Sequence, residues 1–332
     1  MKIGYLGSGA WGFSLARILA ENGHEVVIWT IEESVEKSYR ETKRHPRFPD
    51  IEVKGNMRYT FDIEEAINGV DLVVESVTSK GLRQVLETIE SKGGLEVPFV
   101  LTSKGIEQNT GLLLPEVAIS VFGEGALNRV ACLSGPTLAV EVLANLPASV
   151  VCSSRNKELM EIVAKAFTTP TFRVYPNDDI VGVGFGGAMK NIIAIASGIS
   201  DGLGFGENTK AALMTRGLHE IRKLGKVKGA LPETLNGLSG LGDLCATCIS
   251  NKSRNYQFGY ALAQGLTPDE AQKQIGMVVE GAYTCVSARQ LGQKFGVALP
   301  ITEGVYQVVY EGADPKQVVK SLLTRLIKEE KL

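Results

Sequence analysis

Lys190 lies in a stretch of sequence that is otherwise almost free of polar side chains. From 188 to 199 the chain reads AMKNIIAIASGI, and the only other polar side chains are Asn191 and Ser197. A helix that is apolar on every side is an interior helix, where a lysine is almost never found without a partner. Lys190 then needs an anion, either a fixed carboxylate or a bound substrate, and burial lowers its pKa toward neutrality, which suits proton transfer. The alternative is a lysine that reaches solvent from the edge of the helix.

A second polar cluster lies in residues 237–255, GLSGLGDLCATCISNKSRN, where the density of glycines predicts a tightly shaped segment rather than a plain helix. Asp243 follows a glycine directly. Ser253, Arg254 and Asn255 offer a hydroxyl, a guanidinium fork and an amide, which together suit a phosphate group. A CxxC pair, Cys245 and Cys248, has metal or redox spacing but no second pair or nearby histidine, so we interpret it as structural and expect no metal site.

The first residues of the chain form a glycine-rich turn between a strand-like run and a helix-spaced apolar stripe. Gly7, Gly9 and Gly12 have the GxGxxG spacing, with Ser8, Ala10 and Trp11 between them. The first glycine permits the turn, the second lets a pyrophosphate approach the backbone, and the third lets helix and strand pack closely. The helix that begins near Trp11 would direct its free amides at the phosphates. This context predicts a dinucleotide-binding unit.

An acidic residue is expected about twenty residues after such a turn, where it binds the hydroxyls of the adenosine ribose. Glu32 and Glu33 occupy that place. A carboxylate there repels an additional phosphate and favours NAD over NADP. Four basic residues follow closely and leave both interpretations open, since they could serve a phosphate or form a solvated helix face: Lys37, Arg40, Lys43 and Arg44.

Two further segments follow predicted strands at the edge where ligands of parallel sheets bind. Lys104 stands between Ser103 and Gly105, after the run PFVLT. Gly135 and Thr137 belong to the turn after VACL, which offers backbone amides and a hydroxyl. Each segment is a candidate ligand contact or an ordinary surface turn.

The elements needed to position these residues follow from the periodicity of apolar residues. Strand-like runs occur at 3–6, 26–29, 71–74, 99–102, 130–133, 150–152 and 172–175, and helical stretches separate several of them. The remainder reads as helices at 188–198, 209–224, 257–264, 268–275, 282–295, 302–310 and 315–327. We therefore predict an α/β fold, with a Rossmann-like doubly wound sheet followed by an all-α C-terminal domain. The expected boundary falls between Asp178 and Phe185, which gives a dinucleotide-binding domain of residues 1–180 and a substrate domain of residues 181–332.

Composition limits the classes of partner. The net charge of −2 over 332 residues provides no field that favours nucleic acid or a membrane surface. The apolar stretch 181–199 carries Lys190 and Asn191 at its middle, so we expect a buried helix and no stable membrane insertion. Five cysteines, an odd number, and no recognisable secretion signal favour reduced thiols and a cytoplasmic protein.

Seven ordered segments resemble the bacterial-type NAD(P)-dependent glycerol-3-phosphate dehydrogenases along nearly the whole chain. They are GSGAWG at 7–12, SKGIE at 103–107, LSGPT at 133–137, GGAMKN at 186–191, GLGDL at 240–244, SRN at 253–255 and VVEG at 278–281. The resemblance implies reversible hydride transfer between NAD(P)H and dihydroxyacetone phosphate. The product would be sn-glycerol 3-phosphate, a precursor of glycerophospholipids.

The same resemblance implies roles for individual residues. Lys190 would donate and accept the proton, with Lys104 and Asp243 as further catalytic residues. The substrate would contact Lys104, Gly135, Thr137, Lys190, Asp243, Ser253, Arg254 and Asn255. The cofactor would contact the turn Gly7, Ser8, Gly9, Ala10, Trp11 and Gly12, together with Lys104, Ala139, Arg254, Val278 and Glu280.

The sequence departs from the family pattern at two places. Thr30, Ile31 and Glu32 stand where a basic residue is common, so we expect NADH to serve at least as well as NADPH. Residues 43–49, KRHPRFP, replace a familiar segment, so no contacts are assigned there. Two other functions stay open: a related hydroxyacid dehydrogenase with another small substrate, and a nucleotide sensor without activity. A homodimer is also left open.

Overall fold

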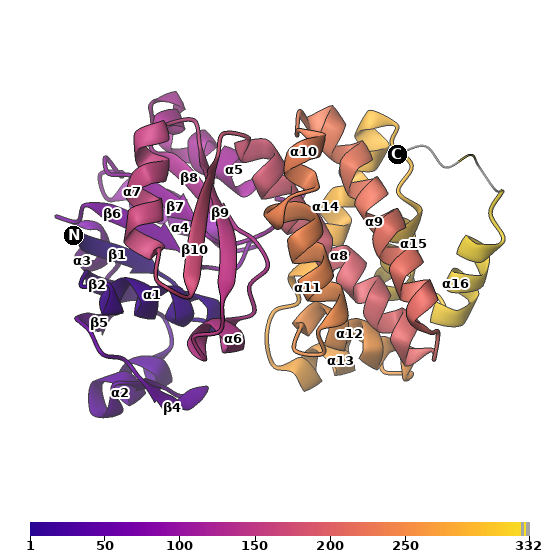
Figure 1. Ribbon diagram of the computed structural model, residues 1–332, viewed down its shortest axis with the longest axis horizontal. Helices are drawn as coiled ribbons and strands as arrows, with labels where there is room; N and C mark the ends of the chain where they lie inside the picture. Colours follow the sequence, from indigo (N-terminus) through magenta and orange to yellow (C-terminus); the bar gives the residue numbers. More distant parts are fainter. Residues whose placement is uncertain (327–328, 330–332) are drawn as a thin grey trace. The chain divides into compact units, whose positions relative to one another are not determined.

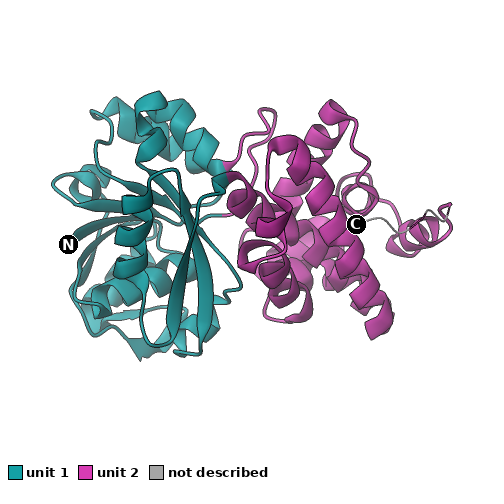
Figure 2. Ribbon diagram, turned by 45° about the horizontal axis from the view of Figure 1, so that its top comes forward, with its two compact units in different colours: residues 1–103, 114–180 teal, residues 104–113, 181–332 magenta. Residues whose placement is uncertain are grey.

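The computed structural model describes residues 1–326 and 329, which form two compact units (Figure 2). The first unit contains residues 1–103 and 114–180, and the second contains residues 104–113 and 181–332. The short segment Lys104–Leu113 thus packs with the second unit, although the sequence analysis had placed it in the first domain. Lys104 therefore belongs to the same unit as Lys190 and Asp243.

The first unit is built on an eight-stranded sheet with the order β10-β9-β8-β7-β6-β1-β2-β5. All seven predicted strands are present, and neighbouring strands pair in parallel except β8 with β9, which the alternating pattern did not predict. A separate antiparallel pair, β3 with β4, was also missed. The strands are β1 Lys2–Leu6, β2 Glu25–Trp29, β3 Arg44–His45, β4 Phe48–Glu52, β5 Met57–Thr60, β6 Leu72–Glu75, β7 Phe99–Leu101, β8 Val130–Ser134, β9 Ala148–Ser154 and β10 Phe172–Asn177.

Helices cover both faces of this sheet, as expected for a doubly wound fold. Along β1, Ile3 and Tyr5 join the core formed with Phe13 of α1, whereas Gly4 faces α3, whose backbone approaches it closely. The helices of this unit are α1 Ala10–Glu21, α2 Glu33–Thr42, α3 Ile63–Ile67, α4 Leu82–Ser91, α5 Leu114–Phe122, α6 Ala139–Leu143 and α7 Lys157–Phe167, with a 3₁₀ turn at Glu124–Asn128. The predicted Rossmann-like sheet is confirmed.

Helices form the regular structure of residues 181–326 of the second unit, which confirms the predicted all-α region (Figure 1). Its helices are α8 Ile180–Gly202, α9 Glu207–Lys228, α10 Pro232–Leu235, α11 Asp243–Ile249, α12 Arg254–Ala263, α13 Pro268–Ile275, α14 Glu280–Phe295, α15 Pro300–Tyr310 and α16 Pro315–Leu323. A π-helical turn, Leu238–Gly242, leads directly into α11. The last predicted helix ends at Leu323, before its expected end at Ile327, which lies outside the described residues.

Helix α8 forms the centre of the second unit. It is long and apolar enough to cross a membrane, yet 78% of its most apolar window is buried inside the protein. Met189, Ile192 and Ile193 have no exposed surface and pack with side chains from the surrounding helices. Helix α8 is therefore a core helix, and Lys190 lies within its buried length.

Helix α12 approaches α8 closely. A Cβ atom at Gly198 of α8 would lie 2.0 Å from the carbonyl oxygen of Tyr256, and one at Gly259 of α12 would lie 1.9 Å from that of Ile195. The two backbones thus meet at a pair of glycines. This crossing fixes α12, which begins at Arg254, against the helix that carries Lys190.

We expect Gly259→Ala to lower the free energy of unfolding by about 3 kcal/mol, because the added methyl group must separate two backbones. Gly125→Ala is the matched control, since a Cβ atom there meets nothing within 4 Å. Denaturant unfolding of the two variants checks this expectation. Equal stability of Gly259→Ala and the unchanged protein would contradict the glycine crossing.

Candidate active site

Lys190 is buried in α8, with 6% of its surface exposed, and it is paired with a fixed carboxylate. Its Nζ lies 2.7 Å from Asp243 Oδ1 and 2.7 Å from Thr247 Oγ1. The prediction that this lysine is buried and needs an anionic partner is confirmed, and the alternative of a lysine reaching solvent is wrong. Thr247 was not singled out from the sequence, although its position four residues after Asp243 places both side chains on one helix face.

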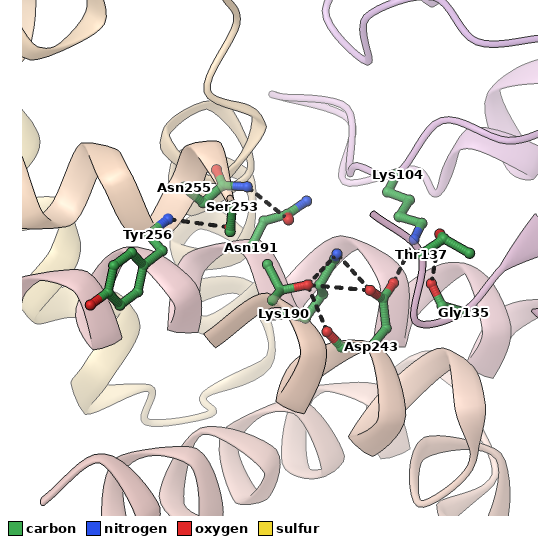
Figure 3. Close-up of polar contacts among 10 residues, drawn as sticks. Lys104, Gly135, Thr137, Lys190, Asn191, Asp243, Ser253, Asn255 and Tyr256 are labelled. Carbon is green, nitrogen blue, oxygen red and sulfur yellow. Dashed lines mark hydrogen bonds and ion pairs between the residues drawn. The ribbon is translucent and has the colours of Figure 1, made fainter. Parts of the chain in front are cut away.

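Asp243 joins two lysines. Its Oδ2 lies 2.5 Å from Nζ of Lys104, while Oδ1 holds Lys190, and Figure 3 shows the carboxylate between the two ammonium groups. The Asp243 residue has no exposed surface, whereas 14% of the Lys104 side chain is exposed. One carboxylate thus pairs with two cations at a largely buried place.

The segment before α11 places this carboxylate. Residues 238–242 form a π-helical turn, a feature that often occurs at functional sites, and Asp243 is the first residue of α11. A negative charge at a helix N-terminus is favourable because the first amides of the helix are directed at it. The expectation of a shaped, non-regular segment holds for residues 238–242, but residues 243–249 form an ordinary short helix.

The environment of Lys190 changes its acidity. Burial lowers its pKa to about 8 from 10.5; Asp243 opposes this change and the charge of Lys104 adds to it. Thr247 donates its hydroxyl proton to the carbonyl oxygen of Asp243, at 2.6 Å, so a lone pair of its Oγ1 can accept from Lys190. Lys190 can therefore change its protonation state near neutral pH.

The segment around Lys104 is attached to α14. Ser287 donates a hydrogen bond of 2.7 Å to the carbonyl oxygen of Ile106, and the side-chain amide of Gln108 donates one of 3.0 Å to that of Tyr283. The backbone amide of Asn109 donates to Gln290 Oε1 at 2.9 Å. These bonds hold the backbone just after Lys104 within the second unit.

A second polar network adjoins α8 and carries the SRN segment. The side-chain amide of Asn255 donates a hydrogen bond of 2.9 Å to Asn191 Oδ1, and its Oδ1 accepts one of 2.9 Å from the backbone amide of Gly281. Ser253 caps α12 by accepting from Tyr256 N, which leaves its hydroxyl proton for another acceptor (Figure 3). Both side chains therefore have structural bonds that the sequence did not predict, and Asn191, which follows Lys190, was not singled out as a network member.

Arg254 is the partly exposed cation of this segment. Its Nη1 donates to the carbonyl oxygen of Val278 at 3.2 Å. The bond links the start of α12 to residues 278–281, which precede and begin α14. The structure thus brings Arg254, Val278 and Glu280 into one region of the second unit, all three of which the resemblance assigned to the cofactor.

The glycine-rich turn of the first unit has the shape that a pyrophosphate requires. Gly7 adopts a φ of +102°, and a Cβ atom at Gly12 would lie 2.5 Å from the carbonyl oxygen of Gly7. A Cβ atom at Gly9 meets nothing within 4 Å, and no side chain caps the helix α1 that follows it. The buried Nε1 of Trp11 has no hydrogen-bond partner in the structure. These residues fit the phosphates of a dinucleotide, for which they leave amide donors at a helix N-terminus.

The region after β2 bears on the ribose. Thr30 is buried and its hydroxyl lies 2.6 Å from that of Ser8, while Glu32 immediately precedes α2 and is partly exposed. Three of the four basic residues that follow have partners of their own: Arg40 with Glu36, Arg44 with Glu52, and Lys43 over the ring of Tyr39. These contacts favour the structural interpretation of the basic residues.

The KRHPRFP segment contacts the turn through His45. Its Nδ1 accepts from the backbone amide of Arg47, so its Nε2 carries the proton and donates to the carbonyl oxygen of Ser8 at 2.9 Å. Burial lowers the pKa of His45, which keeps the ring neutral. This contact was not predicted from the sequence, because it joins residues far apart in the chain.

The remaining predicted residues of the first unit lie at the ends of β8 and α6. Thr137 donates to the carbonyl oxygen of Gly135 at 3.1 Å in the turn after β8 (Figure 3). Ala139 begins α6, and its carbonyl oxygen accepts from Ser14 of α1 at 3.4 Å. Ala139 is thus next to the helix that follows the glycine-rich turn.

Comparison with known proteins identifies the family. Residues 2–160 match the model of the N-terminal part of NAD-dependent glycerol-3-phosphate dehydrogenase, and residues 179–320 match that of its C-terminal part. The chain belongs to the NAD-dependent glycerol-3-phosphate dehydrogenase family. The dehydrogenase resemblance stated from seven segments is therefore confirmed.

Individual glycerol-3-phosphate dehydrogenases match over their full length. The curated NAD(P)+ enzyme of Protochlamydia amoebophila is 54% identical, covering 100% of this chain and 99% of the relative. That of Chlamydia trachomatis serovar L2 is 52% identical over 99% of both chains. The crystal structure of the Coxiella burnetii glycerol-3-phosphate dehydrogenase superposes with a TM-score of 0.92 at 38% identity, covering 98% of this chain and 99% of that one. The chain is therefore an oxidoreductase of this family.

We expect Asp243→Asn to lower the free energy of unfolding at neutral pH by about 3 kcal/mol, because two ammonium groups then face an uncharged amide. The loss should shrink at about pH 9.5, where the neutral form of Lys190 removes one of the charges. Urea unfolding at both pH values checks this expectation. Asp269→Asn, at an exposed position in α13, is the control. A loss that is equal in both variants would contradict the buried pairing.

Proposed function

We propose that this protein catalyses the reversible reduction of dihydroxyacetone phosphate to sn-glycerol 3-phosphate with NADH or NADPH, as a supply of precursor for glycerophospholipids. The observation that carries the proposal is the buried Asp243 carboxylate that binds Lys190 and Lys104. The names of the full-length relatives agree with it. The glycine-rich turn of the first unit binds the pyrophosphate of the dinucleotide, and the two lysines of the second unit act on the carbonyl group of the substrate.

The chemistry follows from the charge that develops on the substrate. The nicotinamide, when bound, supplies or accepts the hydride. In reduction the carbonyl oxygen gains negative charge, which the protonated Nζ of Lys190 stabilises and then neutralises by transferring its proton. Lys104 adds a second positive charge beside the same oxygen. In oxidation the neutral form of Lys190 takes the hydroxyl proton instead.

Asp243 and Thr247 keep Lys190 in position through this cycle. They accept hydrogen bonds from two directions, so the ammonium keeps one proton for the substrate. The pKa of about 8 lets Lys190 lose that proton and recover it from water near neutral pH. Asp243 is thus a partner of both lysines rather than a proton donor.

The phosphate of the substrate binds near the start of α12. Arg254 provides a charged fork, and Ser253 and Asn255 add a hydroxyl and an amide. Gly135 and Thr137 supply backbone and hydroxyl contacts from the turn after β8. This set of donors explains a preference for a phosphorylated substrate over a simple hydroxyacid.

The cofactor contacts follow the fit of the glycine-rich turn. The backbone from Gly7 to Gly12, with Ser8, Ala10 and Trp11, binds the pyrophosphate, and Ala139 lies next to it. Lys104, Arg254, Val278 and Glu280 complete the set. We expect a cytoplasmic enzyme without a nucleic-acid partner, and the homodimer stays a hypothesis.

A steady-state assay with dihydroxyacetone phosphate tests the function and the cofactor together. We expect reduction with both cofactors, and a kcat/KM with NADH at least equal to that with NADPH, because Glu32 repels an additional phosphate. A strong preference for NADPH would contradict the argument from Glu32. Faster reduction of 2-oxoacids than of dihydroxyacetone phosphate would instead favour a hydroxyacid dehydrogenase.

We expect Lys190→Met to lower kcat at least about a hundredfold, because the proton donor is lost while the volume of the side chain is kept. The Kd of NADH, measured by fluorescence, should change little. Lys210→Met is the matched control, because Lys210 is another buried lysine of this unit and pairs with Asp201 at 2.8 Å. Turnover near the unchanged level in Lys190→Met would refute the mechanism.

A further inference from the structure

Glu75 is a fully buried carboxylate that the reaction does not use directly. It is the last residue of β6 and has no exposed surface. No lysine or arginine among residues 1–326 forms an ion pair with it. A buried charge without a cation costs free energy, so a carboxylate at this position needs either compensating bonds or a function.

Three backbone amides donate to the carboxylate and compensate its charge. Oε1 accepts from the backbone amides of Thr102 at 3.1 Å and Ser103 at 3.2 Å. Oε2 accepts from the Val77 amide at 3.0 Å. The Ser103 Oγ lies 2.9 Å from Oε2 and 2.5 Å from the carbonyl oxygen of Val77, and its single proton can serve only one of the two. Burial raises the pKa of Glu75 to about 7, while these bonds oppose the change. The three amides can only donate, so they suit the ionised carboxylate.

A chain of hydroxyl groups reinforces the same place. Thr102 donates its hydroxyl proton to the carbonyl oxygen of Glu75 at 2.7 Å. Ser76 must then donate to Thr102 Oγ1 and Tyr5 to Ser76 Oγ, both at 2.6 Å, because each hydroxyl has one proton. The backbone at the end of β7 is therefore fixed by side-chain as well as main-chain bonds.

Ser103 is covalently bound to Lys104. The carboxylate of Glu75 accepts from the backbone just before this lysine, and hydrogen bonds with Ser287, Tyr283 and Gln290 hold residues 106–109 just after it. The two anchors lie on either side of Lys104 in the chain. The position of the Lys104 ammonium then depends on both anchors.

We propose that Glu75 is a positioning residue for the reaction, which acts by holding the backbone from which Lys104 reaches Asp243. The proposal rests on the function proposed above, in which Lys104 polarises the substrate carbonyl. Glu75 touches neither substrate nor cofactor, and its whole effect on turnover passes through Lys104.

Glu75→Gln tests this, because the amide keeps the shape but turns an NH₂ group toward donors. We expect kcat/KM for dihydroxyacetone phosphate to fall about tenfold in the otherwise unchanged enzyme. In the Lys104→Met background the same substitution should lower kcat/KM less than about twofold, because the position of an uncharged side chain no longer affects the substrate carbonyl. The Kd of NADH should change little in each.

Glu220→Gln is the matched control. Glu220 of α9 is also a buried carboxylate, and it accepts from the backbone amides of Ile301 and Thr302 at the start of α15. It has no bond to the Lys104 segment. Its substitution should lower the free energy of unfolding. Any loss of kcat/KM that it causes should be the same in the unchanged enzyme and in the Lys104→Met background. An equal loss from Glu75→Gln in both backgrounds would show a structural role only and overturn the proposal, as would full activity.

Ser103→Ala provides a second route should Glu75→Gln fail to fold, because it removes the contact of the hydroxyl with the Glu75 carboxylate and its hydrogen bond to the Val77 carbonyl oxygen, while the backbone amides keep theirs. It should show a smaller loss with the same dependence on Lys104, and a loss independent of Lys104 would overturn the proposal. Amide hydrogen exchange at residues 102–106 gives a readout without turnover, and it should rise in both variants. Absence of dihydroxyacetone phosphate reduction in the unchanged protein would refute the proposed function, whereas unchanged exchange in the variants would refute the role of Glu75.

Discussion

The pairing of one buried carboxylate with two lysines is the interaction on which the rest of the structure depends. Asp243 has no exposed surface and binds Lys190 and Lys104 through its two oxygens. Without this charge, holding Lys190 ionised inside an apolar helix would be costly. With it, the lysine stays close to the balance between its charged and neutral forms, which a reversible reduction requires.

Three elements of the second unit meet to form this pairing. Lys190 comes from α8, Asp243 from the N-terminus of α11 behind a π-helical turn, and Lys104 from a segment attached to α14. The glycine crossing of α8 and α12 places the start of α12, with Arg254, in the same unit. Of the groups proposed for proton transfer and phosphate binding, Lys190, Asp243 and Arg254 are thus positioned by helix packing rather than by long loops, which limits their movement.

The sequence predicted the elements and the residue types well, because periodicity, glycine spacing and the cost of burying Lys190 are local signals. It failed where partners come from distant segments. Three such features depend on tertiary packing: β9 pairs antiparallel with β8, residues Lys104–Leu113 pack with the second unit, and His45 contacts Ser8. Thr247 and Asn191 could have been found from helix spacing and adjacency, whereas Glu75 carries no local signal apart from its charge at the end of a strand.

The most direct test of the account is the pH dependence of kcat/KM in both directions of the reaction. With the pKa of Lys190 at about 8, reduction should decline above that pH, and oxidation should rise through the same pH, because the two directions need opposite protonation states. Two mirror-image limbs with one shared pKa are the predicted result. Profiles that are flat between about pH 7 and 9, or that change in the same direction, would contradict the role of Lys190 as the proton carrier.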